Sequence, residues 1–118
     1  MLRILPTDFE FRDERGTLTQ LVHSGYSQVN VISSKQGALR GGHYHKLNEE
    51  AFYVVFGSLE VTVDGEVHTF RQGGFFGIEP FDRHSFRFLE DTVLVSMYSR
   101  GVELEDGTKD IYTGDDGD

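Results

Sequence analysis

Apolar and polar residues alternate in short runs along most of the chain, a period of two that is typical of half-buried β-strands. No segment keeps the i, i+3, i+4, i+7 apolar spacing of an amphipathic helix. Strands are predicted over residues 17–22, 28–33, 39–45, 50–56, 59–63, 66–71, 75–78, 84–88 and 92–98. So many short strands in a chain of 118 residues favour one all-β domain, a sandwich or a barrel.

The turns between these runs have the residues that tight turns require. Asp64-Gly65 separates LEVTV from EVHTF, which is the spacing of a two-residue hairpin. Gly57-Ser58 and Gly73-Gly74 separate other runs, and the chain has 14 glycines and no tryptophan. The core is predicted to contain alternating residues of two strands, namely Phe52, Val54, Phe56, Phe86 and Phe88.

Charge and composition limit the classes of partner that the chain can bind. The net charge is −9, most of it in the acidic C-terminal segment, and no basic stripe suggests binding to nucleic acid or to an anionic membrane. The chain has no cysteine, which excludes disulfides and thiolate metal sites. A cytoplasmic protein is expected, because the first residues do not resemble a signal peptide and no run approaches the roughly 18 apolar residues of a membrane span.

Two histidines and a glutamate are spaced so that three metal-binding groups can converge. The segment GALRGGHYHKLNEEAFYVVFG, residues 37–57, contains His43 and His45, and residues two positions apart on a strand point to the same face. Glu50 begins the next strand after a short connection. This interval selects Glu50, rather than Glu49, as the inward carboxylate.

A second segment, GGFFGIEPFDRHSF, offers a fourth candidate ligand. His84 shares one strand face with Phe86 and Phe88. Three imidazoles and one carboxylate suit Zn, Fe, Mn, Ni or Cu better than Ca or Mg. The alternative interpretation is that these are structural or surface histidines.

These two segments resemble the two sequence motifs of the cupin superfamily, whose members are small jelly-roll barrels (double-stranded β-helices) with a metal inside. The resemblance covers roughly residues 30–99 and implies that His43, His45, Glu50 and His84 hold one divalent transition metal, Zn, Fe, Mn or Ni. We assign residues 1–113 to the cupin domain and expect the acidic, glycine-rich residues 114–118 to be disordered.

A narrower resemblance involves DERGTLTQL, residues 13–21, LRGGHYHK, residues 39–46, and FLEDTVLVSMYS, residues 88–99. They look like segments of dTDP-4-dehydrorhamnose 3,5-epimerases and dTDP-4-keto-6-deoxyhexose 3,4-ketoisomerases. Those ketoisomerases use the histidine pair without a metal, and Tyr44 and Glu50 depart from their pattern. The Arg-Gly-x-His-Tyr-His stretch instead resembles the cupin domain fused to some capsular-sugar nucleotide reductases.

The resemblances imply a metal-binding isomerase or epimerase of a nucleoside diphosphate-linked 4-keto-6-deoxyhexose, in the biosynthesis of surface polysaccharides or deoxysugars. The metal would polarise the keto oxygen while a His or Tyr moves the proton. Tyr53 and Tyr98 are candidates for this step, and without a metal His43 or His45 becomes the base. The alternatives are a non-catalytic cupin that binds a small sugar or carboxylate, and an iron-dependent dioxygenase.

Three cationic residues are candidates for binding the diphosphate at the mouth of the barrel. They are Arg15, Arg40 and Lys46. Strand parity predicts that Arg40 points away from the His43 face, while Arg15 can simply pair with Asp13 in a turn and Lys46 can be an ordinary loop residue.

A homodimer is expected, because a small barrel leaves edge strands that need cover and because related sugar cupins are typically dimers. The apolar segment LRIL, residues 2–5, is predicted to pair across the partner.

Overall fold

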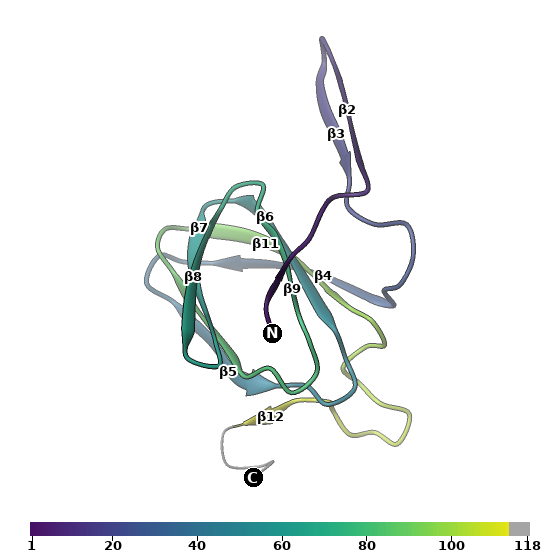
Figure 1. Cartoon of the computed structure of the whole chain (residues 1–118), viewed down its shortest axis with the longest axis vertical. Coiled ribbons are helices and arrows are strands. Elements are labelled where there is room, and N and C mark those ends of the chain that lie inside the picture. Colours follow the sequence, from purple (N-terminus) through teal and green to yellow (C-terminus); the bar gives the residue numbers. More distant parts are fainter. Residues whose placement is uncertain (114–118) are drawn as a thin grey trace.

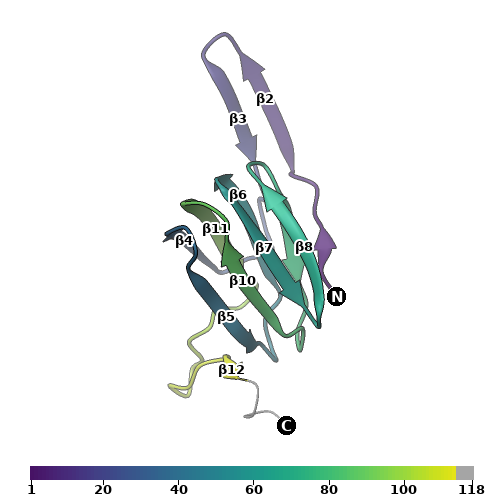
Figure 2. The same ribbon diagram turned by 90° about the vertical axis from the view of Figure 1, so that its left-hand side faces the viewer.

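The computed structural model describes residues 1–113 as an all-β protein in which two five-stranded antiparallel sheets face each other (Figures 1 and 2). One sheet has the order β1-β9-β6-β11-β4 and the other β12-β5-β10-β7-β8, while β2 and β3 form a separate hairpin. The strands are β1 Arg3–Ile4, β2 Phe9–Asp13, β3 Gly16–Gln20, β4 Gln28–Ser34, β5 Leu39–Tyr44, β6 Glu50–Phe56, β7 Ser58–Val63, β8 Glu66–Arg71, β9 Phe75–Ile78, β10 His84–Phe88, β11 Thr92–Tyr98 and β12 Tyr112–Thr113. The predicted fold class, a small jelly-roll barrel, is confirmed.

The core fills the space between the two sheets. It consists of Phe52, Val54, Leu59, Val61, Val63, Phe70, Phe76, Ile78, Phe86, Phe88 and Leu94. Alternation explains why the sequence identified Phe52, Val54, Phe86 and Phe88 as members of it, since every second residue of each strand points inward. This cluster supports the walls of the cavity described below, because Phe52, Phe86 and Leu94 also line that cavity.

Phe56 is the one predicted core residue that the structure places outside. Its side chain is 48% exposed, and the adjacent Val55 is 43% exposed. The ladder between β6 and β11 shifts register between Val93 and Leu94, and such a bulge breaks the inward-outward alternation. The prediction failed because a bulge leaves no mark in the apolar pattern.

The Asp64-Gly65 hairpin has the predicted form. Val63 pairs with Glu66 across the turn, and Asp64 and Gly65 have φ angles of 48° and 86°. Two successive left-handed residues match a type I′ turn, whose twist suits the strands that it joins.

The N-terminal part contains an element that the sequence analysis missed. Strand β2 pairs with β3 in a hairpin that projects from the barrel (Figure 1). The sequence of β2, FEFRD, alternates apolar and polar residues. The apolar side chains of the hairpin, Phe9, Phe11 and Leu18, are however 49%, 54% and 56% exposed, so they are not part of the core. Residues 2–5 are predicted to pair with a partner subunit. In the structure, Arg3 and Ile4 of this segment pair within the same chain, with Gly77 and Phe76 at the edge of β9.

The predicted disordered tail, residues 114–118, lies outside the described residues. Among residues 1–113, no helix has the length and apolar character that crossing a membrane requires.

Candidate active site

The structure brings the four predicted metal-binding side chains together inside the barrel. His43 lies on β5, His45 directly follows that strand, Glu50 begins β6 and His84 begins β10. The candidate ligand atoms of the three histidines all lie within 4.8 Å of one another. Glu50 Oε1 lies 3.0 Å from His45 Nε2 and 3.7 Å from His84 Nε2. Glu49 is exposed and lies 3.6 Å from Arg3, so the spacing argument selected the inward glutamate correctly.

Backbone carbonyl groups orient two of the rings. His84 Nδ1 donates to the Asp82 carbonyl at 2.9 Å, and His45 Nδ1 donates to the Asp110 carbonyl at 2.6 Å. Because a carbonyl can only accept, Nδ1 carries a proton in both rings and Nε2 is left to face the centre of the cluster.

One independent observation indicates that this cluster is suited to binding a metal ion. His84 Nε2 is buried without a hydrogen-bond partner among the described residues, which is costly unless something else occupies that position. A divalent cation bound by imidazole nitrogens and a carboxylate would satisfy this atom.

The protonation of the histidines differs between positions. Burial, together with the neighbouring His84 and His45, lowers the pKa of His43 to about 4, and burial lowers the pKa of His84. Burial also acts against a charged His45, but hydrogen bonds to Glu50 and to the Asp110 carbonyl outweigh it and raise its pKa. His43 and His84 are therefore neutral at physiological pH, which is the form that ligates metals or accepts a proton.

A cavity of about 360 Å³ opens onto this cluster. It is lined by Ile32, Leu39, Arg40, Gly41, His43, Glu50, Phe52, His84, Phe86, Leu94 and Tyr98. One part is therefore apolar, while the histidines, the glutamate and the tyrosine provide polar groups. A small ligand with a polar reacting end and an apolar end matches this lining.

Arg40 faces the same cavity as His43, against the parity argument. In the ladder between β5 and β10, Arg40 pairs with Phe86 and His43 pairs with His84, with a register shift between these pairs. The bulge falls at Gly41 and Gly42, which have φ angles of 94° and 74°. One extra residue reverses the parity, so Arg40 reaches the cavity mouth, where its Nε donates to Ser34 Oγ at 2.7 Å.

The two candidate tyrosines lie on opposite sides of the sheet. Tyr98 lines the cavity, with its ring 5.3 Å from the His45 ring between centroids. Burial, the nearby Glu50 charge and hydrogen bonding to Glu50 raise the pKa of Tyr98, so its phenol keeps its proton at neutral pH. Tyr53 instead packs beside Phe75 in a cluster on the outer face of β6, and the structure does not bring it to the histidines.

Two of the three candidate cations lie away from the cavity lining. Arg15 sits in the turn of the β2–β3 hairpin and forms an ion pair with Asp13 at 2.6 Å. The Lys46 ammonium lies 4.2 Å from the centre of the Tyr112 ring. Arg40 is the member of the set that the structure places at the histidines' cavity.

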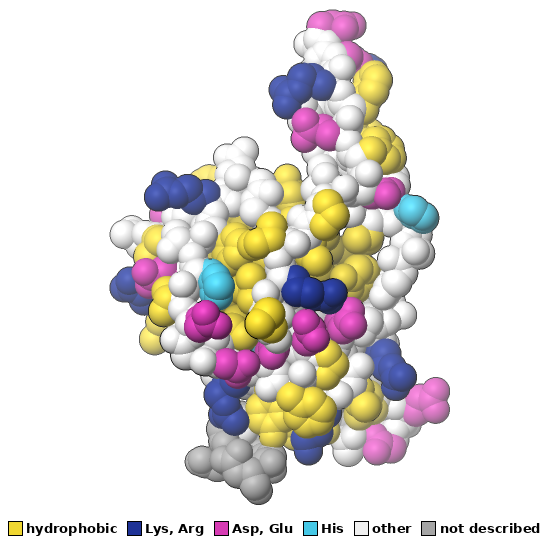
Figure 3. Space-filling model, viewed as in Figure 1, with side chains coloured by type: hydrophobic (Ala, Val, Ile, Leu, Met, Phe, Trp, Pro, Cys, Tyr) yellow, Lys and Arg dark blue, Asp and Glu magenta, His cyan; other side chains and the backbone are white. Residues whose placement is uncertain are grey.

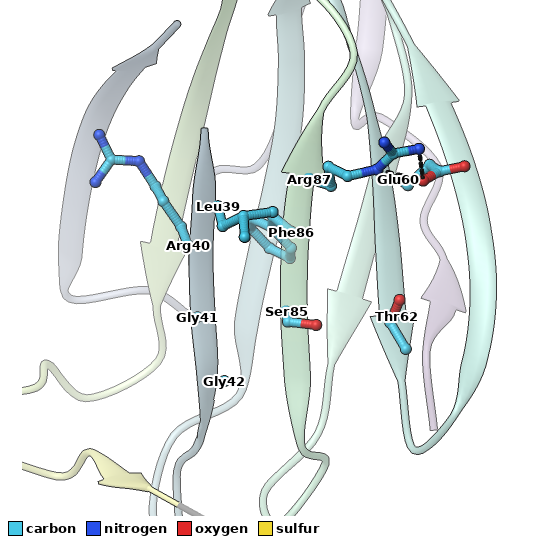
Figure 4. A pocket seen from close by; sticks show the side chains of 9 residues that line it. All are labelled: Leu39, Arg40, Gly41, Gly42, Glu60, Thr62, Ser85, Phe86 and Arg87. Atoms are coloured by element: carbon cyan, nitrogen blue, oxygen red, sulfur yellow. Dashed lines mark hydrogen bonds and ion pairs between the residues drawn. The ribbon is translucent and has the colours of Figure 1, made fainter. Parts of the chain in front are cut away.

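A larger hollow, of about 410 Å³, lies on the outer face of β5, β10 and β7 (Figure 4). Two of its charged residues, Arg87 and Glu60, pair with each other at 2.7 Å, and the third, Arg40, also lines the histidines' cavity. Its lining contains none of the clustered histidines. Leu39 points into it while Arg40 points the other way (Figure 4). The smaller cavity therefore contains the candidate catalytic and metal-binding groups.

Sequence reasoning missed two residues that complete the site. Ser96 on β11 is fully buried and donates to Glu50 Oε2 at 2.8 Å. The sequence contained a signal for Ser96, because strand alternation places this serine at an inward position between Leu94 and Tyr98. Asp110, which is also fully buried, comes from a polar C-terminal segment whose composition gave no signal for it.

Comparison with known families gives one match, to the family described as cupin domain, over residues 30–99. No curated protein matches the chain.

Several solved structures share the fold. A TDP-quinovose 3,4-ketoisomerase from Campylobacter jejuni has a TM-score of 0.78 at 18% identity, covering 96% of this chain and 92% of that one. A dTDP-4-dehydrorhamnose 3,5-epimerase from Sulfolobus tokodaii has a TM-score of 0.67 at 23% identity, covering 77% of this chain and 66% of that one.

The capsular polysaccharide assembling protein CapF from Staphylococcus aureus has a TM-score of 0.62 at 24% identity, covering 89% of this chain but 33% of that longer one. At these identities the likenesses concern the fold.

Proposed function

This chain belongs to the cupin domain family, and from that premise we propose that it is a metal-binding isomerase or epimerase of a nucleoside diphosphate-linked 4-keto-6-deoxyhexose. One observation carries the proposal: proton-transfer groups, candidate metal ligands and an arginine line the same cavity. The similar ketoisomerase and epimerase folds support the substrate class. Such a role, in the biosynthesis of deoxysugars or surface polysaccharides, belongs in the cytoplasm.

His43, His45, Glu50 and His84 are the residues that would hold the metal, Zn, Fe, Mn or Ni. A bound cation supplies Lewis-acid stabilisation of the negative charge that develops on the keto oxygen. Glu50 is held in place by Ser96 and His45, and the Nδ1 hydrogen bonds keep the His45 and His84 rings from turning.

The reaction begins with removal of a proton next to a carbonyl. A C–H bond beside the keto group breaks, and its electron pair forms an enediolate. In epimerisation a proton returns to the opposite face of the same carbon. In isomerisation a proton returns to the former keto carbon, and the hydroxyl proton of the first carbon moves to the former keto oxygen, so that the two carbons exchange keto and hydroxyl groups. Tyr98 is protonated and lines the cavity, so it is the donor. In a metal-free form His43 is the base, because both His45 ring nitrogens already have partners.

The nucleotide lies at the cavity mouth in this proposal, with the diphosphate on Arg40. A cavity of about 360 Å³ is near the lower end of the roughly 300–1,000 Å³ typical of ligand sites, so the sugar enters and the nucleotide stays outside. The same size favours a second candidate, a non-catalytic cupin that binds a small sugar or carboxylate. Basic and acidic side chains intermingle on the face in Figure 3, without the stripe that nucleic acid needs.

We further propose a homodimer built on two open apolar surfaces. The hairpin surface consists of Phe9, Phe11 and Leu18, which register places on one side of β2 and β3; apolar side chains line one side of this hairpin in Figure 3. A lone hairpin is marginally stable.

The sheet surface is the outer face of β4, β11 and β6, where Val29, Val31 and Val55 are 61%, 71% and 43% exposed. Leu5, Leu21, Val22 and Tyr26 of the same chain cover only the other part of that face.

A two-fold dimer would let the hairpin of each copy cover the open sheet surface of the other. The hairpin projects away from its own barrel (Figure 2), so a second copy is the partner with the matching surface. Arg15, at the hairpin turn, takes part in substrate binding only if the dimer brings the partner's cavity to it. Lys46 is the other candidate for binding the diphosphate, beside Arg40.

The test is incubation of the protein with dTDP-4-keto-6-deoxyglucose in D₂O, followed by proton NMR. Deuterium incorporation beside the keto group, with a new isomer or epimer, is the expected result. Tyr98→Phe should slow this exchange at least 100-fold, and Tyr53→Phe, on the other face of the sheet, should not. Nucleotide-sugar binding without exchange would favour the non-catalytic alternative.

Elemental analysis of protein purified without added metal tests the metal separately. One equivalent per chain, lost in His84→Ala, is expected. Turnover with no metal in the protein would favour the reaction in which His43 is the base.

A further inference from the structure

One residue outside the segment that matches the cupin family holds a ligand histidine in place. Asp110 lies in the C-terminal segment just before β12, beyond residues 30–99. Its backbone carbonyl accepts the hydrogen bond from His45 Nδ1 at 2.6 Å, between residues 65 positions apart. The His45 ring is 2% exposed, so this bond is shielded from water and orients the ring strongly.

The carboxylate of Asp110 fixes the position of that carbonyl. It is fully buried, and it accepts hydrogen bonds from the Lys46 amide at 2.9 Å, the Leu47 amide at 2.9 Å and Asn48 Nδ2 at 2.8 Å. These donors belong to the three residues that directly follow His45. Asp110 therefore forms hydrogen bonds both to the ring of His45 and to the turn that directly follows His45.

Asn48 connects these hydrogen bonds to the residues that follow β11. Its Oδ1 accepts from the Arg100 and Gly101 amides at 2.9 and 3.0 Å. The turn after His45, the C-terminal segment and the residues after Tyr98 thus share one buried hydrogen-bond network, in which every link is a fixed N–H to O contact.

We propose that Asp110 is a positioning residue that fixes the tautomer and orientation of His45. The inference rests on the proposed function in that it takes the histidine cluster to be the working site. Because the Asp110 carbonyl can accept but not donate, it forces the proton onto Nδ1 and leaves Nε2 to face Glu50 and the cluster. His84 is oriented in the same way by the Asp82 carbonyl at 2.9 Å.

Nitrogen-15 NMR of the imidazole rings tests the inference on the full chain. In the wild type, the expected result is that Nδ1 of His45 keeps its proton and that Nε2, beside Glu50, is the nitrogen that loses its proton as the pH is raised. Asp110→Ala should give a mixture of tautomers and should weaken the binding of Zn²⁺ alone by about 10–100-fold. The control is Asp106→Asn, since Asp106 is exposed in the same segment and bonds only to Thr108 among the described residues.

Two results would overturn the inference: a wild-type His45 whose Nδ1 carries no proton, or an Asp110→Ala protein with unchanged tautomer and unchanged Zn²⁺ affinity. The wild-type spectrum decides even if Asp110→Ala fails to fold, and Asp110→Asn provides a milder variant. If the wild type binds no Zn²⁺ but has the expected tautomer, the metal part of the proposed function fails while the positioning role stands.

Discussion

Arg40 and His43 line the same cavity although three positions separate them on one strand. The ladder pairs Arg40 with Phe86 and His43 with His84, and the bulge at Gly41 and Gly42 makes this possible. The strand thereby presents the candidate phosphate-binding cation and a candidate catalytic histidine on one side.

Replacing Arg40 by Ala should weaken the binding of dTDP by about 10–100-fold, because a charge-assisted contact contributes roughly 1.5–3 kcal/mol. Calorimetric titration of the nucleotide measures it. Arg87→Ala is the matched control, since Arg87 lies on the outer face and pairs with Glu60. Equal losses in both variants would mean that only general attraction to positive charge had been measured.

The bulge itself can be tested with two neighbouring glycines. A Cβ on Gly41 would lie 2.8 Å from the His84 carbonyl oxygen and 2.9 Å from Ser85 Cα, whereas a Cβ on Gly42 meets nothing within 4 Å. Gly42→Ala should cost about 1–2 kcal/mol for its left-handed backbone, and Gly41→Ala should cost clearly more and weaken dTDP binding. Denaturant unfolding measures both, and equal costs would contradict the close approach of β5 to β10.

The low pKa of His43 predicts a pH dependence of stability. That pKa falls from about 6.5 to about 4 on folding, so the unfolded chain binds more protons between these values and folding stability falls as the pH drops through this window. His43→Gln removes this contribution. The variant should therefore lose about 1 kcal/mol less stability than the wild type between pH 7 and pH 5, measured by urea unfolding at both pH values. An identical loss in both proteins would show that His43 protonates freely in the folded state.

Metal binding should strengthen as the pH rises, because His45 has a raised pKa and must lose a proton before its Nε2 can ligate. Below that pKa, Zn²⁺ affinity should increase about tenfold per pH unit. Calorimetry in two buffers of different ionisation enthalpy would count the released protons. A Zn²⁺ affinity that stays constant between pH 6 and pH 8 would contradict the link.

The two proposed dimer surfaces predict which substitutions would prevent self-association. Phe11→Asp on the hairpin and Val31→Asp on the sheet surface should each weaken self-association tenfold or more, since each buries a charge in an apolar contact. Sedimentation velocity measures the effect. Thr17→Asp is the control, because register places Thr17 on the opposite, polar side of the hairpin. A wild type that sediments as a monomer at micromolar concentration would refute the homodimer.

Much of the site was readable from the sequence because strand geometry is local. The period of two places His43 and His45 on one face, and the short connection to Glu50 leaves little freedom in where that carboxylate can go. Core residues such as Phe52 and Phe86 follow from the same alternation. These predictions depend only on neighbours within a few residues.

Other features were decided only by the tertiary structure. The bulges that turned Arg40 inward and Phe56 outward arise from pairing with another strand, and alternation within one strand cannot reveal them. Tyr53 and Tyr98 were equal candidates until the packing of the sheet placed one on each side.

Asp110 shows the same division most clearly. By itself it is one acidic residue in a polar segment, and only its burial beneath the turn after His45 makes it part of the site. Local patterns determined which residues can reach the centre of the barrel. Contacts between distant segments decided which of them are held there, because a hydrogen bond across 65 positions depends on the fold and has no periodicity in the sequence.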